Sequence, residues 1–204
     1  FVFSHGCASP PATPVCYLDL YGHSSLSTSG LPLGVQTIEL VVKMTGVTGN
    51  GVPVVGNSFE TGGRAWGLYF GEDRLYSAEG GDPTWPYASG TSPVDGMWHH
   101  VAIAGDTLYV DGVVSIQGVP NHLSTKSDMW IGWQAGQYVC CEMGGTLQVK
   151  DVRVWTTVRN QQQIASSSLA GSGLISHLTL AGDFQDSSGE SAVWTPSGPF
   201  VFSH

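Results

Sequence analysis

The chain has 204 residues, and its formal net charge is −9 because 16 acidic residues face only 7 lysines and arginines. This balance excludes a nucleic-acid partner and an anionic membrane surface as targets, since both need clustered Lys and Arg. The length favours one domain over residues 1–204. No apolar stretch approaches the ~20 residues that a membrane-spanning helix requires, so we expect no membrane insertion.

The beginning of the chain and its cysteines suggest an extracellular protein. The sequence begins at Phe1 without a signal-like segment, so we interpret it as a mature or excised domain. The even set of Cys7, Cys16, Cys140 and Cys141 favours disulfides and a secreted location. One pairing joins Cys7 to Cys16 and closes a strained bond between Cys140 and Cys141. In another, Cys7 and Cys16 each bond one member of the adjacent pair. Four reduced core cysteines are the alternative.

Short runs of apolar and β-branched residues predict strands along most of the chain. In chain order they lie at 15–20, 24–27, 36–43, 52–56, 65–70, 74–78, 97–104, 108–111, 113–117, 129–132, 146–155 and 174–180. The turns at 71–73 and Asp111–Gly112 predict hairpins. The segment Arg159–Ser168 is the one helical candidate. The class is all-β, and the spacing of the short strands indicates a two-sheet sandwich.

The pentapeptide FVFSH occurs twice, at Phe1–His5 and at Phe200–His204. The plainest interpretation is that the two terminal strands pair antiparallel and close a sheet, with alternate rings pointing inward. An array of similar domains, or chance, would also explain the repeat. The duplicated strand would also suit a homo-oligomer that is joined edge to edge.

Five segments resemble, in their order, the laminin-G-like, pentraxin-like and legume-lectin-like (concanavalin A-like) jelly rolls. They are QTIELVVK (Gln36–Lys43), GLYFGEDRLY (Gly67–Tyr76), DGMWHHVAIAGDTLYVDG (Asp95–Gly112), WIG (Trp130–Gly132) and GGTLQVKDVRVW (Gly144–Trp155). The resemblance covers residues 15–190 and implies a jelly-roll sandwich of two antiparallel sheets. It does not fix the function, because this fold hosts lectins, glycosidases and adhesion modules.

Residues suited to saccharide binding are concentrated in loops. Aromatic rings stack on the C–H faces of a sugar, and amides and carboxylates bind its hydroxyl groups. Chain direction puts loop 57–64 and loop 79–96 at one end of a sheet, and the resemblance implies that the loop after Gly132 joins them. The predicted carbohydrate-binding rim comprises Asn57, Glu60, Asp82, Trp85, Tyr87, Trp133, Gln137, Tyr138, Cys140, Cys141 and Glu142.

A structural role is the competing interpretation of these rings, which would then cover sheet edges or fix loops. Four further tryptophans lie inside strand patterns, and we assign them to the core: Trp66, Trp98, Trp130 and Trp155. His99 and His100 are adjacent in a strand, so their side chains point to opposite faces.

Calcium is the metal that the resemblance implies, because some members, including pentraxins, use Ca²⁺ to hold their ligand. Asn57, Glu60, Asp82 and Gln134 offer oxygen ligands of the kind that Ca²⁺ prefers. The loop after Gly132 weakens this expectation because its one carboxylate is Glu142. Asp183 and Asp186 form a second candidate pair, and a structural turn is the competing interpretation.

We found no catalytic constellation. Glycosidases of this fold carry an alternating acidic triplet, and the sequence contains none. Asp95 and Asp111 fall in turns, and Asp151 is expected to be solvated. We therefore predict a secreted, non-catalytic lectin that binds glycans. The alternatives are a glycoside hydrolase or polysaccharide lyase that uses Glu60, Asp82 or Glu142, and a protein-binding adhesion module.

Overall fold

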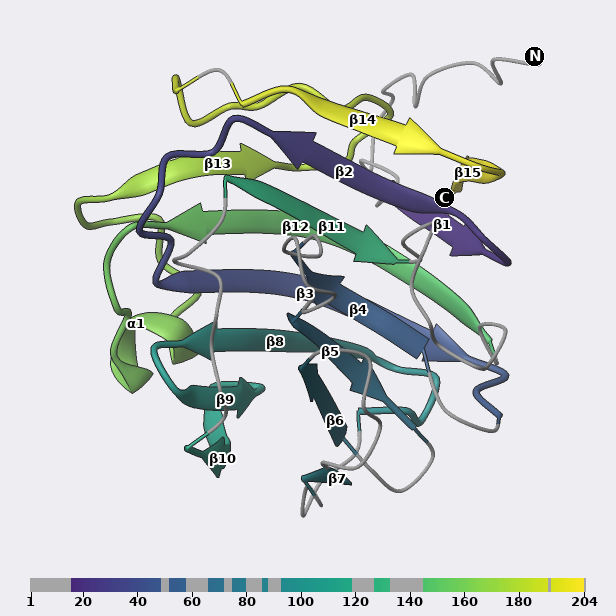
Figure 1. The fold of residues 1–204 in the computed structure, drawn as a ribbon, viewed down its shortest axis with the longest axis horizontal. Coiled ribbons are helices and arrows are strands. Elements are labelled where there is room, and N and C mark those ends of the chain that lie inside the picture. Colours follow the sequence, from purple (N-terminus) through teal and green to yellow (C-terminus); the bar gives the residue numbers. More distant parts are fainter. Residues whose placement is uncertain are drawn as a thin grey trace, which may run out of the picture.

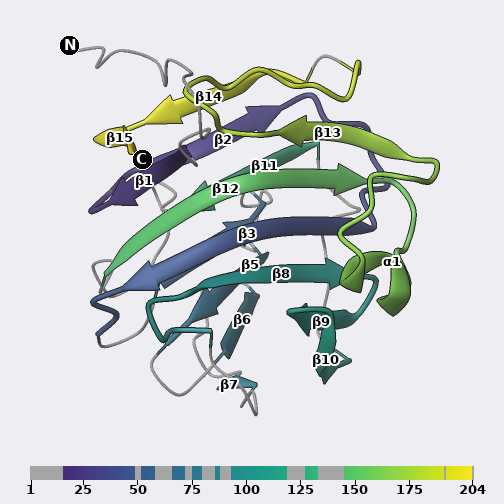
Figure 2. The same cartoon turned by 180° about the vertical axis from the view of Figure 1, so that it is seen from behind.

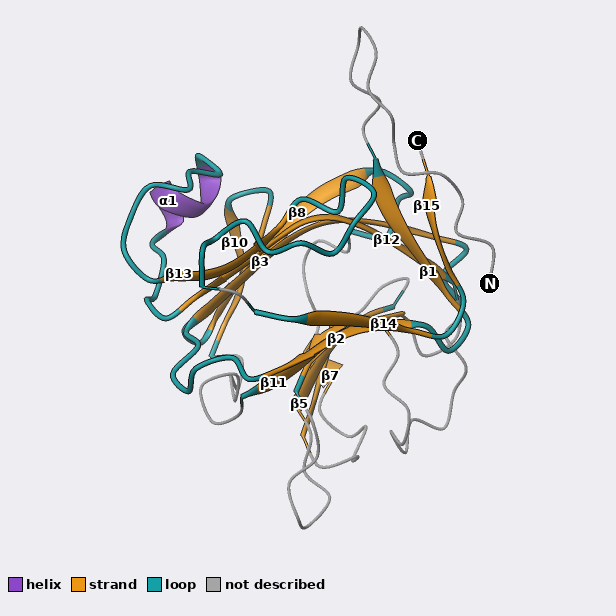
Figure 3. Ribbon diagram, turned by 90° about the horizontal axis from the view of Figure 1, so that it is seen from above, coloured by secondary structure: helices purple, strands orange, loops and turns teal. Residues whose placement is uncertain are grey.

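The computed structural model describes residues 16–48, 52–57, 66–71, 75–79, 86–87, 93–118, 127–132, 145–190 and 192–203. Within these ranges the chain folds into two antiparallel sheets and one short helix. The sheets are stacked as two layers around a common core (Figure 3). The predicted all-β jelly-roll sandwich is confirmed.

Sheet A contains eight of the described strands (Figure 1). Seven follow the order β10 (Val113–Gln117), β9 (Thr107–Val110), β8 (Trp98–Ala104), β3 (Thr37–Thr45), β12 (Thr146–Trp155), β1 (Tyr17–Tyr21) and β15 (Phe200–Ser203). The eighth, β13 (Leu174–Leu178), pairs with the second half of β12, beyond the part that pairs with β1.

Sheet B contains seven of the described strands. Their order is β14 (Trp194–Ser197), β2 (Ser25–Ser29), β11 (Asp128–Gly132), β4 (Val52–Gly56), β5 (Trp66–Phe70), β6 (Leu75–Glu79) and β7 (Pro86–Tyr87). Two of these strands, β7 and β14, were not expected from the sequence. Both lie at the edges of the sheet, and β14 contains Pro196, which an edge strand tolerates because one row of its backbone groups is unpaired.

The core lies between the sheets and follows the two-residue period of the strands. On β3, Ile38, Leu40, Val42 and Met44 are fully or almost fully buried and belong to one apolar cluster. The intervening residues of β3 face outward, because successive side chains of a strand alternate between its two faces. The outer face of sheet A therefore carries a different, more polar set of side chains.

A β-bulge interrupts β12 at Asp151. The pairing of β12 with β3 shifts between Lys150 and Val152, and Asp151 has a left-handed backbone with φ of 57°. A bulge adds one residue to a strand and thereby resets its alternation. Val152 and Val154 consequently continue the buried face, and Arg153 points outward.

The helix α1 (Gln161–Ala165) lies on the outer face of sheet A, close to β8, β9 and β10 (Figure 2). It is shorter than the predicted segment. Asn160 caps its first turn by accepting a hydrogen bond from the backbone N–H of Gln163. Ile164 is the buried residue of the helix, and it joins a small apolar cluster with Ala102, Ala104 and Tyr109.

The C-terminal copy of FVFSH forms β15, an edge strand of sheet A among the described residues. β15 pairs antiparallel with β1, and its expected pairing with Phe1–His5 stays a prediction because that segment lies outside the described residues. Cys16 is buried immediately before β1. Cys7, Cys140 and Cys141 also lie outside the described residues, so the pairing of the cysteines stays a prediction.

Candidate functional site

Strand pairing decides from which end of sheet B each predicted loop leaves. Gly56 at the end of β4 pairs with Gly67, and Trp66 at the start of β5 pairs with Glu79 at the end of β6. The loop after β4 and the loop after β6 therefore leave sheet B at the same end, which we call the Asn57 rim. This part of the sequence prediction is confirmed.

The loop after β11 leaves from the opposite end. Trp130 pairs with Gly56 and Ile131 pairs with Val55, so β11 runs antiparallel to β4 and its last residue, Gly132, points away from the Asn57 rim. We call this second end the Gly132 rim. In this register Gly132 lies opposite Val54, which is three residues from Asn57 along β4, or about 10 Å at ~3.3 Å per residue. The prediction that the loop after Gly132 leaves sheet B from the same end as the loops after β4 and β6 is therefore wrong.

The correction divides the predicted site residues into two groups. The loops that contain Glu60, Asp82 and Trp85 begin at the Asn57 rim, and the loop that contains Trp133, Gln134, Gln137, Tyr138, Cys140, Cys141 and Glu142 begins at the Gly132 rim. Tyr87 lies in β7 opposite Leu75, near the hairpin that ends β5. Except for Asn57 and the backbone of Tyr87, these residues lie outside the described residues, so their contact with a saccharide stays a prediction.

Two glycines anchor the 133–144 loop at the Gly132 rim. Gly132 has φ of +84°, and a Cβ atom there would lie 2.8 Å from the carbonyl oxygen of Ser24 and 2.9 Å from Leu20 Cδ1. Gly145 has φ of +153°, and its Cβ would lie 2.8 Å from the carbonyl oxygen of Thr45. Both ends of the loop are therefore packed directly against the turns that follow β1 and β3.

These two anchors were missed in the sequence, although the glycines are visible in WIG and in EMGGT. The signal would have been a glycine at each boundary between a strand and the same loop, which indicates positions that have a special backbone or a close approach. The structure therefore fixes the two ends of the loop, Gly132 and Gly145, on the turns after β1 and β3.

Asn57 has a structural role at the opposite rim. Its side chain and backbone are 2% exposed, and its backbone carbonyl accepts a hydrogen bond of 3.1 Å from Trp130 Nε1. A residue this buried is poorly placed to contact a saccharide. Trp130 and Trp155 are 2% and 0% exposed, so their assignment to the core is confirmed. The side chain of Trp66 is not among the described ones.

Trp98 is not a core residue. It is half-buried, and its ring lies edge-on to Tyr17 with the centroids 5.3 Å apart. The Lys150 ammonium lies 4.1 Å from the centre of the Trp98 ring, and burial lowers the pKa of Lys150 although nearby Asp151 opposes this shift. Because Lys150 covers the ring face, Trp98 is not an open stacking surface for a sugar. Its outward direction follows from alternation with buried Val101 and Ile103.

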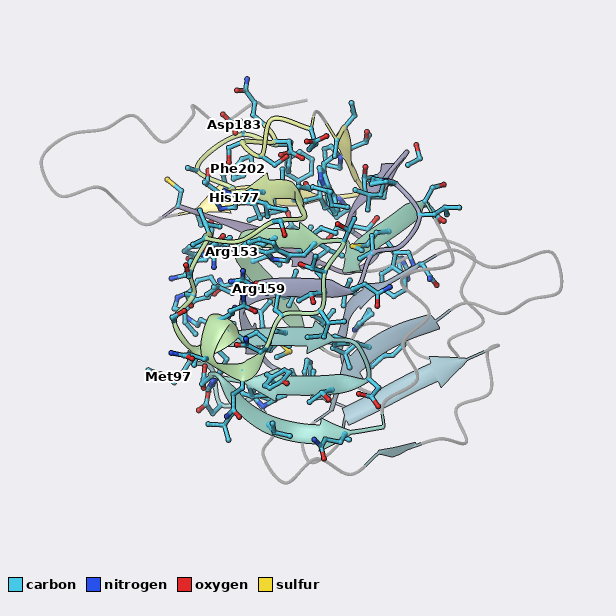
Figure 4. The ribbon with its side chains drawn as sticks, turned by 90° about the vertical axis from the view of Figure 1, so that its left-hand side faces the viewer. Met97, Arg153, Arg159, His177, Asp183 and Phe202 are labelled. Atoms are coloured by element: carbon cyan, nitrogen blue, oxygen red, sulfur yellow. The ribbon has the colours of Figure 1, made fainter. Side chains whose placement is uncertain are left out.

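A buried ionic cluster occupies the outer face of sheet A beside α1. Glu39 is 1% exposed and pairs with Arg159 Nε at 3.3 Å and with His100 Nε2 at 3.1 Å. The Arg159 guanidinium stacks 3.9 Å from the Trp155 ring centre and donates to the carbonyl oxygen of Ala170 at 2.9 Å. These contacts hold the helix and the segment after it on the sheet. Figure 4 shows the neighbouring Arg153 and His177 on the same face.

Asp151 belongs to this structural network. It accepts hydrogen bonds from Arg153 Nε at 2.9 Å and contacts His177 Nε2 at 3.0 Å. Burial tends to raise its pKa, but the hydrogen bonds from His177 and Arg153 dominate and lower it. Asp151 is therefore paired and partly buried, and the expectation that it is solvated is wrong.

A second charged cluster fixes the start of β8. His99 Nδ1 lies 2.7 Å from Asp111 Oδ2, and His99 Nε2 lies 2.9 Å from Asp95 Oδ1. Burial opposes the charged form of His99, but the two carboxylates outweigh it and raise its pKa. The hydrogen bond from His99, with one from the Met97 backbone, lowers the pKa of Asp95. The cluster joins the segment before β8 to the β9–β10 turn.

Asp183 and Asp186 form turns. Asp183 Oδ1 accepts a hydrogen bond from the Gln185 backbone at 3.1 Å, and Asp186 Oδ1 accepts from the backbones of Ser188 and His177. Burial tends to raise the pKa of Asp186, but hydrogen bonds, the first from Ser176, lower it. The structural interpretation of this pair is confirmed. Across the described ranges, no group of three or more His, Cys, Asp and Glu side chains is placed to hold a metal ion.

The two-sheet topology agrees with a match to a known family. A family model described as the concanavalin A-like lectin/glucanases superfamily matches residues 19–165. The chain belongs to this superfamily. None of the curated proteins matches the chain. In the described part of this superfamily member, no helix has the length and hydropathy that crossing a membrane requires.

Solved structures extend the likeness of fold beyond the matched segment. A Bacteroides ovatus protein with a suggested carbohydrate-binding role is 19% identical, with a TM-score of 0.63 over 94% of this chain and 61% of its own. The SAP-like pentraxin from Limulus polyphemus is 12% identical, with a TM-score of 0.60 over 92% and 94% of the two chains. A Trypanosoma rangeli sialidase bound to sialic acid is 17% identical, with a TM-score of 0.52 over 76% and 28%. At these identities the likeness concerns the fold alone.

Proposed function

We propose that the protein is an extracellular, non-catalytic lectin that binds a glycan at the Gly132 rim. The observation that carries the proposal is the anchoring of both ends of the 133–144 loop by Gly132 and Gly145. The anchored loop holds two aromatic residues, two glutamines and Glu142. Fixing its ends reduces the entropy that ordering the loop on a ligand would cost. The superfamily and the suggested role of the Bacteroides ovatus neighbour support this proposal.

The residue types of the loop suit an uncharged saccharide. Trp133 and Tyr138 offer faces on which sugar C–H groups stack, and Gln137 and Glu142 offer partners for pairs of hydroxyl groups. Arg153 and Arg159 are engaged in the cluster of sheet A, on the other layer of the sandwich. The described arginines therefore do not serve a charged ligand at this rim.

A glycan array followed by calorimetry tests the proposal. We expect the chain to bind at least one glycan. We expect Trp133→Ala or Tyr138→Ala to weaken binding at least tenfold, because each removes one aromatic ring on which a sugar stacks. Tyr17→Ala is the matched control, since Tyr17 contacts Trp98 on the outer face of sheet A. No binding to any glycan at millimolar sugar, or equal losses in all three variants, would reject the proposal.

We also propose that Ca²⁺, if it binds, binds at the Asn57 rim and not at the Gly132 rim. Glu60 and Asp82 belong to loops that begin at the Asn57 rim, whereas Gln134 follows Gly132 at the opposite end. The four ligands predicted from the sequence therefore do not come from one end of the sheet. Thermal melts with Ca²⁺ and with EDTA test this: stabilisation by Ca²⁺ that Glu60→Gln and Asp82→Asn abolish supports it. Stabilisation that only Gln134→Ala abolishes contradicts it.

A hydrolase of the same superfamily would need an accessible pair of carboxylates. Among the described carboxylates, Glu39 pairs with Arg159, Asp95 contacts His99, and Asp186 accepts a hydrogen bond from the backbone N–H of Ser188. Release of reducing ends from a polysaccharide panel, lost in Glu60→Gln or Asp82→Asn, would replace the lectin proposal. Binding to a protein partner that saccharides do not compete with would instead support an adhesion module.

A further inference from the structure

β15 lies along the edge of β1, at one edge of the described sheet A. We use the word groove for the surface of β1 and Phe184 that β15 covers. Its register runs from Phe200 opposite Leu20 to Ser203 opposite Tyr17. Phe200 and Phe202 are partly buried against the core, whereas the intervening Val201 is 41% exposed. The groove therefore holds alternate side chains of the strand that fills it.

Three contacts make the groove selective for the sequence that it holds. The Phe184 ring, in the segment after β13, lies 5.5 Å from the Phe200 ring and 5.1 Å from the Phe202 ring, centre to centre. Asp19 Oδ2 accepts a hydrogen bond of 2.5 Å from Ser203 Oγ. Together these contacts recognise the pattern Phe-x-Phe-Ser.

The chain contains a second copy of the same pattern. Phe1–His5 is identical to Phe200–His204, so Phe1, Phe3 and Ser4 repeat the spacing of the three groups that the groove contacts. If Ser4 took the place of Ser203 opposite Tyr17, residues 5–16 would connect the strand to β1. Twelve residues easily join neighbouring strands that lie ~4.8 Å apart, and a loop of this length adds little closure entropy.

We propose that the groove beside β1 is a binding site for a Phe-x-Phe-Ser strand, and that Phe1–Ser4 of the same chain is its second occupant. The two copies compete for the groove in the same direction and register. The C-terminal copy is seated in the structure, and the N-terminal copy replaces it when it leaves. Release of β15 consequently leaves the core covered, and it frees the C-terminal strand for contact with another molecule.

A mutant cycle on the full chain tests the competition. We expect F1S/F3S to change the melting temperature by less than ~1 °C, because the C-terminal copy fills the groove. F200S/F202S is expected to lower it by only about 2–4 °C, because the N-terminal copy takes over. All four substitutions together should lower it by at least ~10 °C, since neither copy can then bury its rings. V2S/V201S is the matched control, and it should behave as wild type because Val201 is 41% exposed and Val2 is its counterpart in the repeated sequence.

The cycle has clear contrary outcomes. If F200S/F202S is as unstable as the fourfold variant, Phe1–Ser4 does not enter the groove and the proposal fails. If the stability of F200S/F202S falls on tenfold dilution, or light scattering shows dimers, the second occupant comes from another molecule and the same-chain assignment is wrong. A melting temperature that does not depend on protein concentration supports it.

Hydrogen exchange provides a test that does not require the fourfold variant to fold. In F200S/F202S, or in the milder F202L, the amides of residues 1–4 should become protected by at least tenfold relative to wild type. The amides of β1 should keep their protection, because a strand still pairs with them. Loss of protection along β1 with no gain at residues 1–4 would overturn the proposal.

Discussion

Sheet A and sheet B use their polar residues in different ways. On the outer face of sheet A, Glu39, Arg153 and Arg159 are almost fully buried and hold α1 and the chain after it. The turns between neighbouring strands β8, β9 and β10 have two residues each. Sheet B is instead bordered by two long connections, 57–65 between β4 and β5 and 133–144 from β11 to β12 of sheet A, and these contain most of the predicted binding residues. The difference indicates that buried charge stabilises sheet A, whereas the strand ends of sheet B lead into the predicted binding loops.

The largest effect should come from removing the charge at the centre of sheet A. We expect Glu39→Ala to destabilise the protein by about 3–5 kcal/mol, because it leaves buried Arg159 without its carboxylate. The melting temperature should fall by roughly 10 °C on the scale for this chain length. Glu190→Ala, at an exposed position, is the control. Glycan affinity of the folded fraction should not change, and a loss of affinity would show that the two layers do not act separately.

A smaller effect should come from the loop anchor of sheet B. Gly132→Ala is expected to cost about 1–3 kcal/mol more than Gly118→Ala in chemical denaturation, because overpacking adds to the shared strain. Both glycines have φ near +80°, but a Cβ at Gly118 would meet nothing within 4 Å. Glycan binding should weaken in Gly132→Ala and be preserved in Gly118→Ala. Equal behaviour of the two variants would mean that the close approach to Ser24 does not position the loop.

The smallest effect should be a pH dependence near β8. The pKa of His99 is raised in the folded protein, so its pairing with Asp95 and Asp111 is fully present below the unfolded pKa of ~6.5 and is lost as pH rises through the folded value. Wild type should exceed His99→Gln in melting temperature by about 2–4 °C at pH 6 and by less at pH 9. An NMR titration of His99 that gives a pKa below 6.5 would contradict this.

The strands were predictable where the sequence pattern is local. Val52–Gly56, Val113–Gln117 and Thr146–Trp155 have the bounds that alternation and turn residues indicated. The pattern failed for β14, whose segment combines Trp194 with Pro196 in a polar surrounding. It also failed for Trp98. Its hydrophobicity suggested a core position, but the alternation of the strand directs its side chain outward.

The site was harder to predict because pairing direction is a non-local property. The alternation within Met129–Gly132 does not indicate which neighbour the strand pairs with. The antiparallel pairing of β11 with β4 shows that the loop after Gly132 begins at the rim opposite to the one expected. The buried pairing of Glu39 with Arg159 was also invisible, since 120 residues separate the two partners. By contrast, Gly132 and Gly145 are visible in the sequence at the two ends of one loop. The structure shows that both have a positive φ and a close backbone approach.

The bulge at Asp151 has a consequence for how the sequence of β12 can change. The pairing of β12 with β3 shifts by one residue at this point, so Asp151 is the extra residue of the strand. If Asp151 were deleted, the strand would alternate regularly, and all four core residues would still point inward in one phase: Leu147, Val149, Val152 and Val154. Deletion of Lys150 would preserve the same phase, with Asp151 in its place, whereas deletion of Gln148 or Arg153 would turn one of the flanking inward residues outward. The middle of the longest strand thus contains one site, Lys150–Asp151, where a single-residue deletion is compatible with the core.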